Sequence, residues 1–562
     1  MVAFIISLFA ARLIQLQGID ENDYAALAEA KGAQTIVLEA PRAPIYDRSG
    51  VILAQSVDAA KLVADPVLSA KDAPQIAAVL HHRIGADYLQ TVAMLRQPDT
   101  RYVELARHLP PRTASETVAR LERLRLPGVY TAHDTLRVYP SGDVAASLLG
   151  YVGTDGDGLQ GVEAAYQDTL AGVDGEATYQ VEGGQILPLA DSTIQEPQEG
   201  TGVRLTIDQD LQFLAQRRLA EAVQGADADS GSAIVMDTRT SQVLALADYP
   251  SYDPNDFTPT DRDLGLSASL GAAYEPGSVE KVLTFSALLD AGYVTPRTKI
   301  VVPPVLQVGG DWVHDYFGHD TLHLTAAGVI AKSSNIGTVR AAAKMPDREL
   351  YRYLTRFGIG SQPHIGIGGA SAGLLADPST WPAIQRANID FGQGVSVTAL
   401  QMATAISAVA NGGEYVAPSL VQGTVDSSGR LTPAPAPERH RVISAQAAHE
   451  VTRMMETVVG PEGTAPAAAI SGYQVAGKTG TAQRANPDCG CYDGTFTVSF
   501  AGFAPADDPR FAVYVVIQNP RAAGAGGGAT AGPVFHDLMV AALAKYGVPP
   551  TGHREPFLPA TW

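Results

Sequence analysis

The pattern of apolar and polar positions divides the first part of the chain into two regions. Between about residues 34 and 195, short β-type runs are separated by Gly, Pro and Asp, and one helical stretch is expected at 113–124. After the polar, turn-forming segment 196–202, residues 203–207 alternate as a strand and residues 208–223 have the period of an amphipathic helix. This change predicts a domain boundary near residue 200.

Strand patterns also lie on both sides of a long helical region. Residues 232–246 contain two strand-like runs around a turn, helical periodicity dominates 277–411, and strands return at 496–500 and 511–517. Strands at both ends of a segment can share one sheet only if the chain returns to it. We therefore expect an α+β architecture, with a sheet assembled from distant parts of the sequence and helices between its strands.

The amino terminus predicts a membrane segment. Met1–Ala11 is uncharged and almost wholly apolar, and it ends at Arg12. At 1.5 Å per residue it covers only about 17 Å of a hydrocarbon core that is about 30 Å thick. A signal peptide would carry its charge before the apolar run. We interpret residues 1–17 as the outer end of a single anchor helix that starts upstream; the alternative is a buried first helix.

Composition and charge exclude several classes of protein. The 562 residues leave room for several domains, and 46% hydrophobic with 18% charged residues is typical of a folded chain. With a net charge of −19, the chain lacks the positive charge that a general nucleic-acid binder carries. The two cysteines, Cys489 and Cys491, exclude a disulfide framework and a four-thiolate zinc module. No apolar run is long enough for a multi-pass membrane protein.

The first candidate motif is S-x-x-K, formed by Ser278 and Lys281. Pro276 and Gly277 predict a helix start that places both side chains one turn apart on the same face. A serine becomes an effective nucleophile when a neighbouring base removes its proton. A lysine can be that base only if burial or a nearby cation lowers its pKa from about 10.4. Alone, the motif is more typical of a capped helix with a solvated lysine than of a catalytic pair.

The second motif, S-x-N, lies between two helical stretches. Ser333 can relay a proton, and the amide of Asn335 can orient a lysine or hold a substrate carbonyl. Alone, it is a polar turn.

The third motif, K-T-G-T, has the features of an edge strand that lines a cleft. Gly480 permits another backbone to approach closely. The fixed charge of Lys478 and the hydroxyls of Thr479 and Thr481 suit a carboxylate ligand. The backbone N–H groups of Thr481 and Ser278 are candidates for an oxyanion hole. Alone, it is a Gly-flanked turn.

The ordered set is much more specific than any one motif. The order S-x-x-K, S-x-N, K-T-G is the pattern of penicilloyl-serine transferases. The chain closely resembles class B penicillin-binding proteins, and among them division-type (FtsI-like) peptidoglycan D,D-transpeptidases. Four further segments carry this resemblance over nearly the whole chain: R-x-x-I-x-D-R-x-G at 42–50, G-x-x-G-x-E at 158–163, L-T-I-D with L-Q at 205–212, and D-F-G-Q-G at 390–394.

The resemblance implies a domain organisation. It divides the chain into a partial membrane-anchor helix, an elongated β-rich non-catalytic pedestal of the dimerisation type, a transpeptidase domain and a tail. The corresponding residues are 1–17, 18–200, 201–548 and 549–562. The transpeptidase domain is expected to have the β-lactamase-like fold, with a central antiparallel sheet flanked by helices.

The resemblance also implies a reaction. Ser278 is the acylated nucleophile and Lys281 its general base. The remaining members of the site form a proton and hydrogen-bond network and a carboxylate-binding strand: Ser333, Asn335, Lys478, Thr479, Gly480 and Thr481. Attack on a D-Ala–D-Ala bond releases the terminal D-alanine, and an amine of a neighbouring stem peptide then takes the acyl group. β-Lactams acylate the same serine, and no metal or organic cofactor is implied.

Location and partners follow from the same resemblance. It implies a single-pass anchor in the cell membrane, a catalytic domain on the extracytoplasmic side, and pairing with a polytopic membrane glycosyltransferase and other division proteins. Three alternatives stay open: an elongation-type transpeptidase, a β-lactamase and a catalytically silent division scaffold. The long pedestal argues against a β-lactamase, and the complete motif set argues against a scaffold.

Some residues depart from the family pattern. Glu280, inside S-x-x-K, replaces a residue that is more often apolar or neutral; adjacent helical residues point apart, so we expect it to face away from Lys281. The Cys489–Cys491 pair is expected in a polar loop, where a bridge would be tight. His319 and His323 have the spacing of helical zinc ligands, but we expect a loop and turn there.

Overall fold

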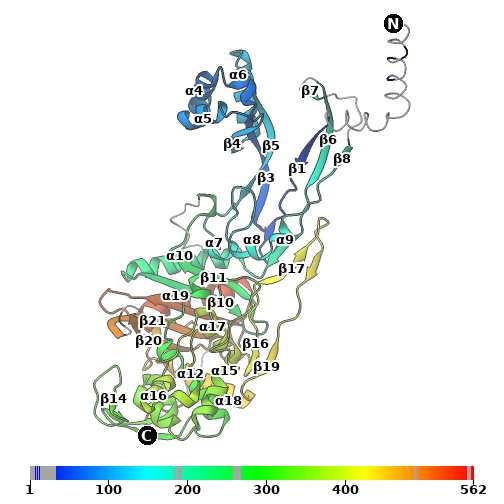
Figure 1. Cartoon of the computed structure of the whole chain (residues 1–562). Coiled ribbons are helices and arrows are strands. Elements are labelled where there is room, and N and C mark those ends of the chain that lie inside the picture. Colours follow the sequence, from blue (N-terminus) through cyan, green and yellow to red (C-terminus); the bar gives the residue numbers. More distant parts are fainter. Residues whose placement is uncertain are drawn as a thin grey trace. The chain divides into compact units, whose positions relative to one another are not determined.

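The computed structural model describes residues 33–182, 185–186, 193–256, 267–486, 489, 491–552 and 558–562, together with Ser7, Phe9 and Arg12 (Figure 1). The anchor expected at residues 1–17 lies outside the described residues, except at those three positions. Within the described ranges, no helix is both long and apolar enough to cross a membrane.

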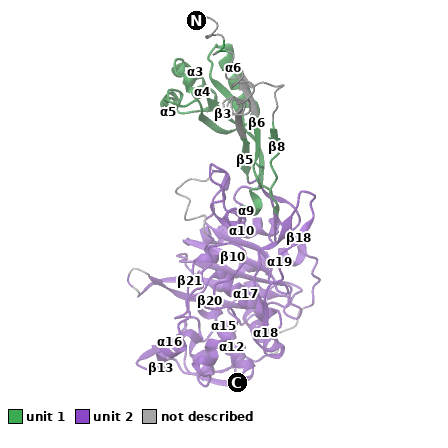
Figure 2. Ribbon diagram, turned by 45° about the vertical axis from the view of Figure 1, so that its right-hand side comes forward, with its two compact units in different colours: residues 1–44, 55–138, 168–202 green, residues 45–54, 139–167, 203–562 purple. Residues whose placement is uncertain are grey.

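The chain forms two compact units that do not follow the sequence linearly (Figure 2). The smaller unit contains residues 1–44, 55–138 and 168–202, and the larger unit contains residues 45–54, 139–167 and 203–562. Two segments before residue 200 therefore belong with the C-terminal part of the chain.

The smaller unit combines antiparallel strands with helices. Its strands are β1 (Ala33–Leu38), β3 (Ile52–Ala64, from residue 55), β4 (Val103–Leu109), β5 (Val129–Val138), β6 (Gly175–Glu182), β7 (Gln185–Ile186) and β8 (Thr193–Gln195). Its main helices are α3 (Pro66–Ser69), α4 (Ala73–Ile84), α5 (Tyr88–Leu95) and α6 (Pro111–Arg123). The sequence predicted α6 but not α4, whose buried Ile76 and Leu80 pack in one core with Leu62 and Leu121. The smaller unit therefore contains more helix than the sequence predicted.

The larger unit is built on the predicted antiparallel sheet. Its order is β11-β10-β22-β21-β20, and each neighbouring pair is antiparallel. The strands are β10 (Ser230–Asp237), β11 (Val243–Tyr249), β20 (Ala476–Asn486), β21 (Cys491–Ala504) and β22 (Phe511–Gln518). β20, which carries K-T-G, lies at the edge of this sheet, as the sequence predicted.

Helices pack on both faces of this sheet (Figure 1). One layer contains α10 (Gln209–Gly225) and α19 (Gly532–Lys545), and the other contains α12 (Lys281–Asp290), α17 (Ala399–Ala410) and α18 (Ala445–Val459). Every residue of α12 from its start to Leu289 is buried, so the helix that begins at Lys281 is a core helix.

Short strands interrupt the region that the sequence predicted as helical. They are β12 (Lys299–Val302), β13 (Leu306–Val308), β14 (Asp311–Val313) and β15 (Leu322–Thr325). Helices α13 (Ala326–Lys332), α14 (Asn335–Ala342), α15 (Asp347–Arg356) and α16 (Ala383–Asp390) follow. Smaller elements of the larger unit are α7 (Ala146–Leu149), α8 (Gly161–Ala165), α11 (Ala268–Gly271), β2 (Ile45–Tyr46), β9 (Gly202–Leu205, from residue 203), β16 (Glu414–Val416), β17 (Val421–Val425), β18 (Leu431–Pro433) and β19 (Arg439–Arg441).

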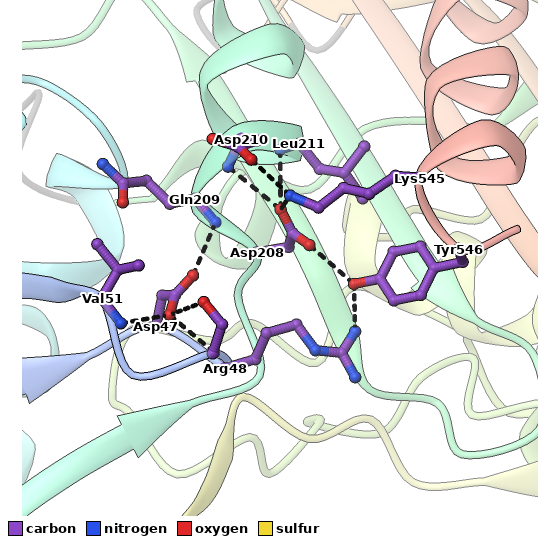
Figure 3. A network of polar contacts seen from close by, with 10 residues as sticks. Asp47, Arg48, Val51, Asp208, Gln209, Asp210, Leu211, Lys545 and Tyr546 are labelled. Atoms are coloured by element: carbon purple, nitrogen blue, oxygen red, sulfur yellow. Dashed lines mark hydrogen bonds and ion pairs between the residues drawn. The ribbon is translucent and has the colours of Figure 1, made fainter.

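A polar network, which we call the Asp208 clasp, joins three distant segments of the larger unit (Figure 3). Asp208 caps the start of α10 and accepts hydrogen bonds from Lys545 (2.6 Å) and Tyr546 (2.9 Å) at the end of α19. The Tyr546 hydroxyl accepts a hydrogen bond from Arg48 (2.6 Å). Asp47, beside it, accepts the backbone N–H of Val51 (2.8 Å) and orders the turn. The R-x-x-I-x-D-R-x-G segment is therefore tied to both helices.

Candidate active site

The nucleophile candidate lies on a tight turn against the edge strand. Ser278 is half-buried on the 3-10 turn Gly277–Val279, which leads directly into α12. Gly277 has φ +56°, and a Cβ there would lie 3.0 Å from the Thr481 carbonyl oxygen and from Ala482 Cβ. A glycine is needed at this position for its backbone angle and for the close approach of β20.

Lys281 is the centre of a buried hydrogen-bond network. Its Nζ donates to the Ser333 carbonyl oxygen (2.6 Å) and to Asn335 Oδ1 (2.7 Å), and lies 3.5 Å from Ser333 Oγ. The side chain is 0% exposed. S-x-x-K and S-x-N, which are far apart in sequence, therefore meet at one amine.

The S-x-N turn joins α13 to α14, as predicted. Ser333 is the C-cap of α13 with φ +58°, a left-handed conformation that is unusual for a residue with a side chain. Ser334 caps α14, where its hydroxyl accepts the N–H of Gly337 (2.8 Å). This sharp turn directs both Ser333 and Asn335 toward Lys281.

Strand β20 supplies the second buried amine. Lys478 Nζ donates to Ser333 Oγ (2.8 Å) and to the Thr479 carbonyl oxygen (2.9 Å), and it is 0% exposed. Ser333 Oγ thus lies between the two lysine amines. Thr481 is exposed on the same strand, which leaves its groups accessible to a ligand.

The electrostatics favour a lysine base. Burial lowers the pKa of Lys281 to about 7, although Asp315 acts in the opposite direction. Burial, and then the charge of Lys281, lowers the pKa of Lys478 well below its ordinary value. Near pH 7, Lys281 is therefore partly a free base and can accept a proton. Because its pKa is lowered, Lys478 does not carry a fixed positive charge. A bound anion would favour its ammonium form.

The structure brings together most of the predicted site residues. Hydrogen bonds connect Lys281, Ser333, Asn335, Lys478 and Thr479. Contacts between the 3-10 turn and β20 bring the predicted nucleophile turn and oxyanion strand side by side: a Cβ on Gly480 would lie 3.0 Å from Val279 Cγ2 and 3.1 Å from the Pro276 carbonyl oxygen.

Sequence reasoning missed two residues that support the site. Thr464 Oγ1 lies 2.9 Å from Thr479 Oγ1. Asp315, in the loop between β14 and β15, accepts hydrogen bonds from the S-x-N turn. Both lie in loops without a periodic pattern, and nothing in the sequence alone marks them.

Three departures from the family pattern can now be placed. Glu280 is fully buried, and the amine of Lys281 is bound instead to the S-x-N turn. Cys489 and Cys491 form a disulfide, which decides a redox state that the sequence left open. His323 lies on β15 and His319 in the loop before it, so their spacing is not helical.

Comparisons with known proteins match both parts of the chain. The penicillin binding protein transpeptidase domain matches residues 231–540, and the penicillin-binding protein dimerisation domain matches residues 37–205. The chain is 36% identical to penicillin-binding protein PbpB of Mycolicibacterium smegmatis, over 85% of this chain and 74% of that protein. It is 34% identical to peptidoglycan D,D-transpeptidase FtsI of Escherichia coli K12, over 92% of this chain and 86% of that protein.

A solved structure agrees with the fold. Penicillin binding protein 3 of Mycobacterium tuberculosis, complexed with aztreonam, superimposes with a TM-score of 0.73 at 32% sequence identity. The match covers 94% of this chain and 100% of that one.

Proposed function

We propose a function from the premise that this chain belongs to the penicillin-binding protein transpeptidase family. It is a serine-type D-Ala–D-Ala transpeptidase that cross-links peptidoglycan stem peptides through an acyl-enzyme and is acylated by β-lactams. The observation that carries this conclusion is the buried Lys281–Ser333–Lys478 network behind the half-buried Ser278.

The first half-reaction forms the acyl-enzyme. The free amine of Lys281 accepts the Ser278 Oγ proton, and Oγ attacks the carbonyl carbon of the penultimate D-alanine. The backbone N–H groups of Ser278 and Thr481 stabilise the oxyanion of the tetrahedral intermediate. The C–N bond then breaks, and the terminal D-alanine leaves as an amine after it receives the proton from Lys281 through Ser333.

The second half-reaction transfers the acyl group. An amine of a neighbouring stem peptide attacks the ester carbonyl, Lys281 takes the amine proton, and Ser278 Oγ leaves with a proton as the new amide forms. We assign binding of the donor carboxylate to Lys478, Thr479 and Thr481, with Gly480 allowing the close approach of the backbone. The buried amine of Lys478, whose ammonium form a bound carboxylate favours, and two hydroxyls on an edge strand support this assignment.

Intact-mass spectrometry after incubation with a β-lactam tests the function. We expect a lasting adduct of one antibiotic mass on the wild-type protein and none on Ser278→Ala. Turnover of the antibiotic without a lasting adduct would identify a β-lactamase instead. Neither adduct nor turnover would support a silent scaffold.

The cellular setting belongs to the proposal as well. We infer a division role over an elongation role because a relative that covers 92% of the chain is an FtsI protein. An anchor at residues 1–17 would hold the transpeptidase domain (201–548) and its tail (549–562) on the extracytoplasmic side. The pedestal at 18–200 would contact a polytopic membrane glycosyltransferase and other division proteins. Co-purification of the glycosyltransferase with the full chain and with a chain that lacks residues 55–138, which belong to the smaller unit, tests this contact. Equal capture by both chains would contradict it.

A further inference from the structure

The loop between β14 and β15 is largely exposed, but its Asp315 and His319 side chains are buried, and it holds the S-x-N turn. Asp315 Oδ2 accepts a hydrogen bond from Ser334 Oγ (2.7 Å), and Asp315 Oδ1 accepts the N–H of Ile336 (3.0 Å). The side chain of Asn335 contacts the backbone of the same loop, because its Nδ2 donates to the His314 carbonyl oxygen (2.9 Å). The Asp315 side chain is 0% exposed. One loop therefore fixes three consecutive residues of the turn.

These contacts determine which atom of the Asn335 amide accepts the hydrogen bond from the Lys281 amine. Because Asn335 Nδ2 donates to the loop, its Oδ1 is turned toward Lys281 Nζ, at 2.7 Å. The Ser334 hydroxyl donates to Asp315, and its oxygen accepts the N–H of Gly337 at the start of α14. The loop thus fixes the acceptor side of Asn335 and the direction of the Ser334 hydroxyl.

His319 completes the cluster as a counter-ion. Its Nε2 lies 3.1 Å from Asp315 Oδ2, and its Nδ1 lies 2.5 Å from the Asp320 carbonyl oxygen. An ionised carboxylate and a carbonyl oxygen both accept hydrogen bonds, so both ring nitrogens must donate. The geometry therefore fits an imidazolium, whose side chain is only 5% exposed.

The charges that face this cluster come from several elements. Tyr316 and His319 lie on the same loop and Lys281 on α12, whereas Lys478 on β20 acts on the cluster through Lys281. Burial lowers the pKa of Lys281, and the carboxylate of Asp315 opposes this effect. The negative charge of Asp315 therefore favours the protonated form of Lys281, and an imidazolium at His319 would oppose that influence.

We propose that Asp315 is a positioning residue of the acylation reaction, which acts through Ser334 and Asn335 to hold the Lys281 amine in place, with His319 as its buried counter-ion. The inference rests on the proposed function, since it requires that Ser278 is acylated. Asp315 does not touch the reacting atoms; its effect passes through the S-x-N turn and through its charge.

The test is the pH profile of acylation by a fluorescent penicillin. In Asp315→Asn, we expect the rate constant on the plateau to fall about 10- to 100-fold, because the turn is no longer held in place. We also expect the midpoint of the acidic limb to move to lower pH, because a charge that favours the Lys281 ammonium is gone. In His319→Gln, which keeps a donor but loses the positive charge, the midpoint should move to higher pH.

A matched control is Asp237→Asn. Asp237 is also buried, accepts the backbone N–H groups of Arg239 (3.0 Å) and Thr240 (3.1 Å), and pairs with Arg510. It is the last residue of β10 and caps the turn that leads to β11, so its profile should keep the wild-type midpoint. Thermal unfolding of each variant identifies losses of folding.

Shifts of the midpoint in opposite directions support the proposal. An unshifted midpoint in either variant, or an equal loss of rate in all three without any shift, overturns it as a merely structural effect. If Asp315→Asn does not fold, the shift in His319→Gln decides the question alone. Failure of the proposed function is recognised separately: the wild-type protein would then be acylated no faster than Ser278→Ala, and both ideas would fall.

Discussion

At the scale of single residues, burial of the two lysines is the main cause of the site's reactivity. Lys281 and Lys478 are hydrogen-bonded and fully enclosed, and this desolvation makes an ordinarily protonated side chain available as a base. The sequence identified both lysines by their motifs. It could not identify Asp315 or Thr464, because their roles depend on loops brought into contact by the fold.

Glu280 is the least satisfied side chain near the site. It is fully buried, and within the described part of the chain neither carboxyl oxygen has a hydrogen-bond partner. Burial, and then the charge of Asp390, raises its pKa well above the ordinary value. The folded protein therefore keeps a proton that the unfolded chain loses above about pH 4.3. The free energy of unfolding consequently falls as pH rises from there toward the pKa of the folded state.

We therefore predict that Glu280→Met stabilises the protein. An unsatisfied buried polar group costs about 1–3 kcal/mol, and methionine has a similar length without that group. The gain in the free energy of unfolding should be larger at pH 8 than at pH 4, as measured by urea titration at both values. A variant that is less stable than wild type at pH 8 would show that the carboxyl group has a partner in solution. Acylation should persist, since Lys281 is bound to the S-x-N turn.

At the scale of elements, the approach of the nucleophile turn to β20 is the critical contact. We predict that Gly277→Ala strongly slows acylation, because φ +56° and a neighbouring oxygen at 3.0 Å both oppose a Cβ. Gly292→Ala is the matched control: it has φ +75°, but a Cβ there would meet nothing within 4 Å. It should lose about 1 kcal/mol of stability and keep the wild-type acylation rate, measured with the same fluorescent penicillin. Equal acylation rates in the two variants would contradict this account.

The Asp208 clasp predicts a pH-dependent contribution to stability. Burial alone would raise the pKa of Asp208, but hydrogen bonds from Lys545, the Leu211 backbone and Tyr546 hold it below the ordinary value. A lowered pKa stabilises the fold above the pKa of the unfolded chain, about 3.9, and this contribution is lost as pH falls through the folded value.

We predict that Asp208→Asn lowers the free energy of unfolding at pH 7 by about 1–3 kcal/mol, because charged hydrogen bonds are removed. The difference from wild type should shrink as the pH is lowered toward 3, in parallel urea titrations. A difference that does not change with pH would assign the effect to packing or to the cap of α10 instead of the charge.

The sequence predicted an element well where its periodic pattern extended over many residues. The hairpin of β10 and β11 and the amphipathic helix α10 lie where the pattern placed them, and α17 lies within the region predicted as helical. Strands β12 to β15 were missed because runs of three or four residues cannot be distinguished from the helical periodicity around them. Helix α4 was missed because the strand-like runs on both sides dominated the pattern.

At the scale of the whole molecule, the division into units is discontinuous. The segments 45–54 and 139–167 belong to the larger unit, although the sequence pattern changes only near residue 200. Such a division depends on contacts between distant segments, such as the parallel pairing of β2 with β9 and the bond from Arg48 to Tyr546. Local periodicity carries no information about these contacts.

A truncation tests this organisation. We predict that a chain starting at residue 203 unfolds at a lower temperature than the full chain, because it lacks β2 and the Arg48 side of the clasp. Its Ser278 should still be acylated, since every predicted site residue is retained. Differential scanning calorimetry of both chains gives the comparison, and an unchanged unfolding temperature would show that segments 45–54 and 139–167 add no stability to the larger unit.

The central claim is that the buried amine of Lys281 activates Ser278. The most direct measurement is the rate constant for acylation of wild-type Ser278 by a fluorescent penicillin between pH 5 and pH 9. We predict a rate that rises with pH through a midpoint near 7, where Lys281 changes from ammonium to free amine. A rate that is constant over this range, or that rises only toward the ordinary pKa of lysine near 10.4, would contradict Lys281 as the base.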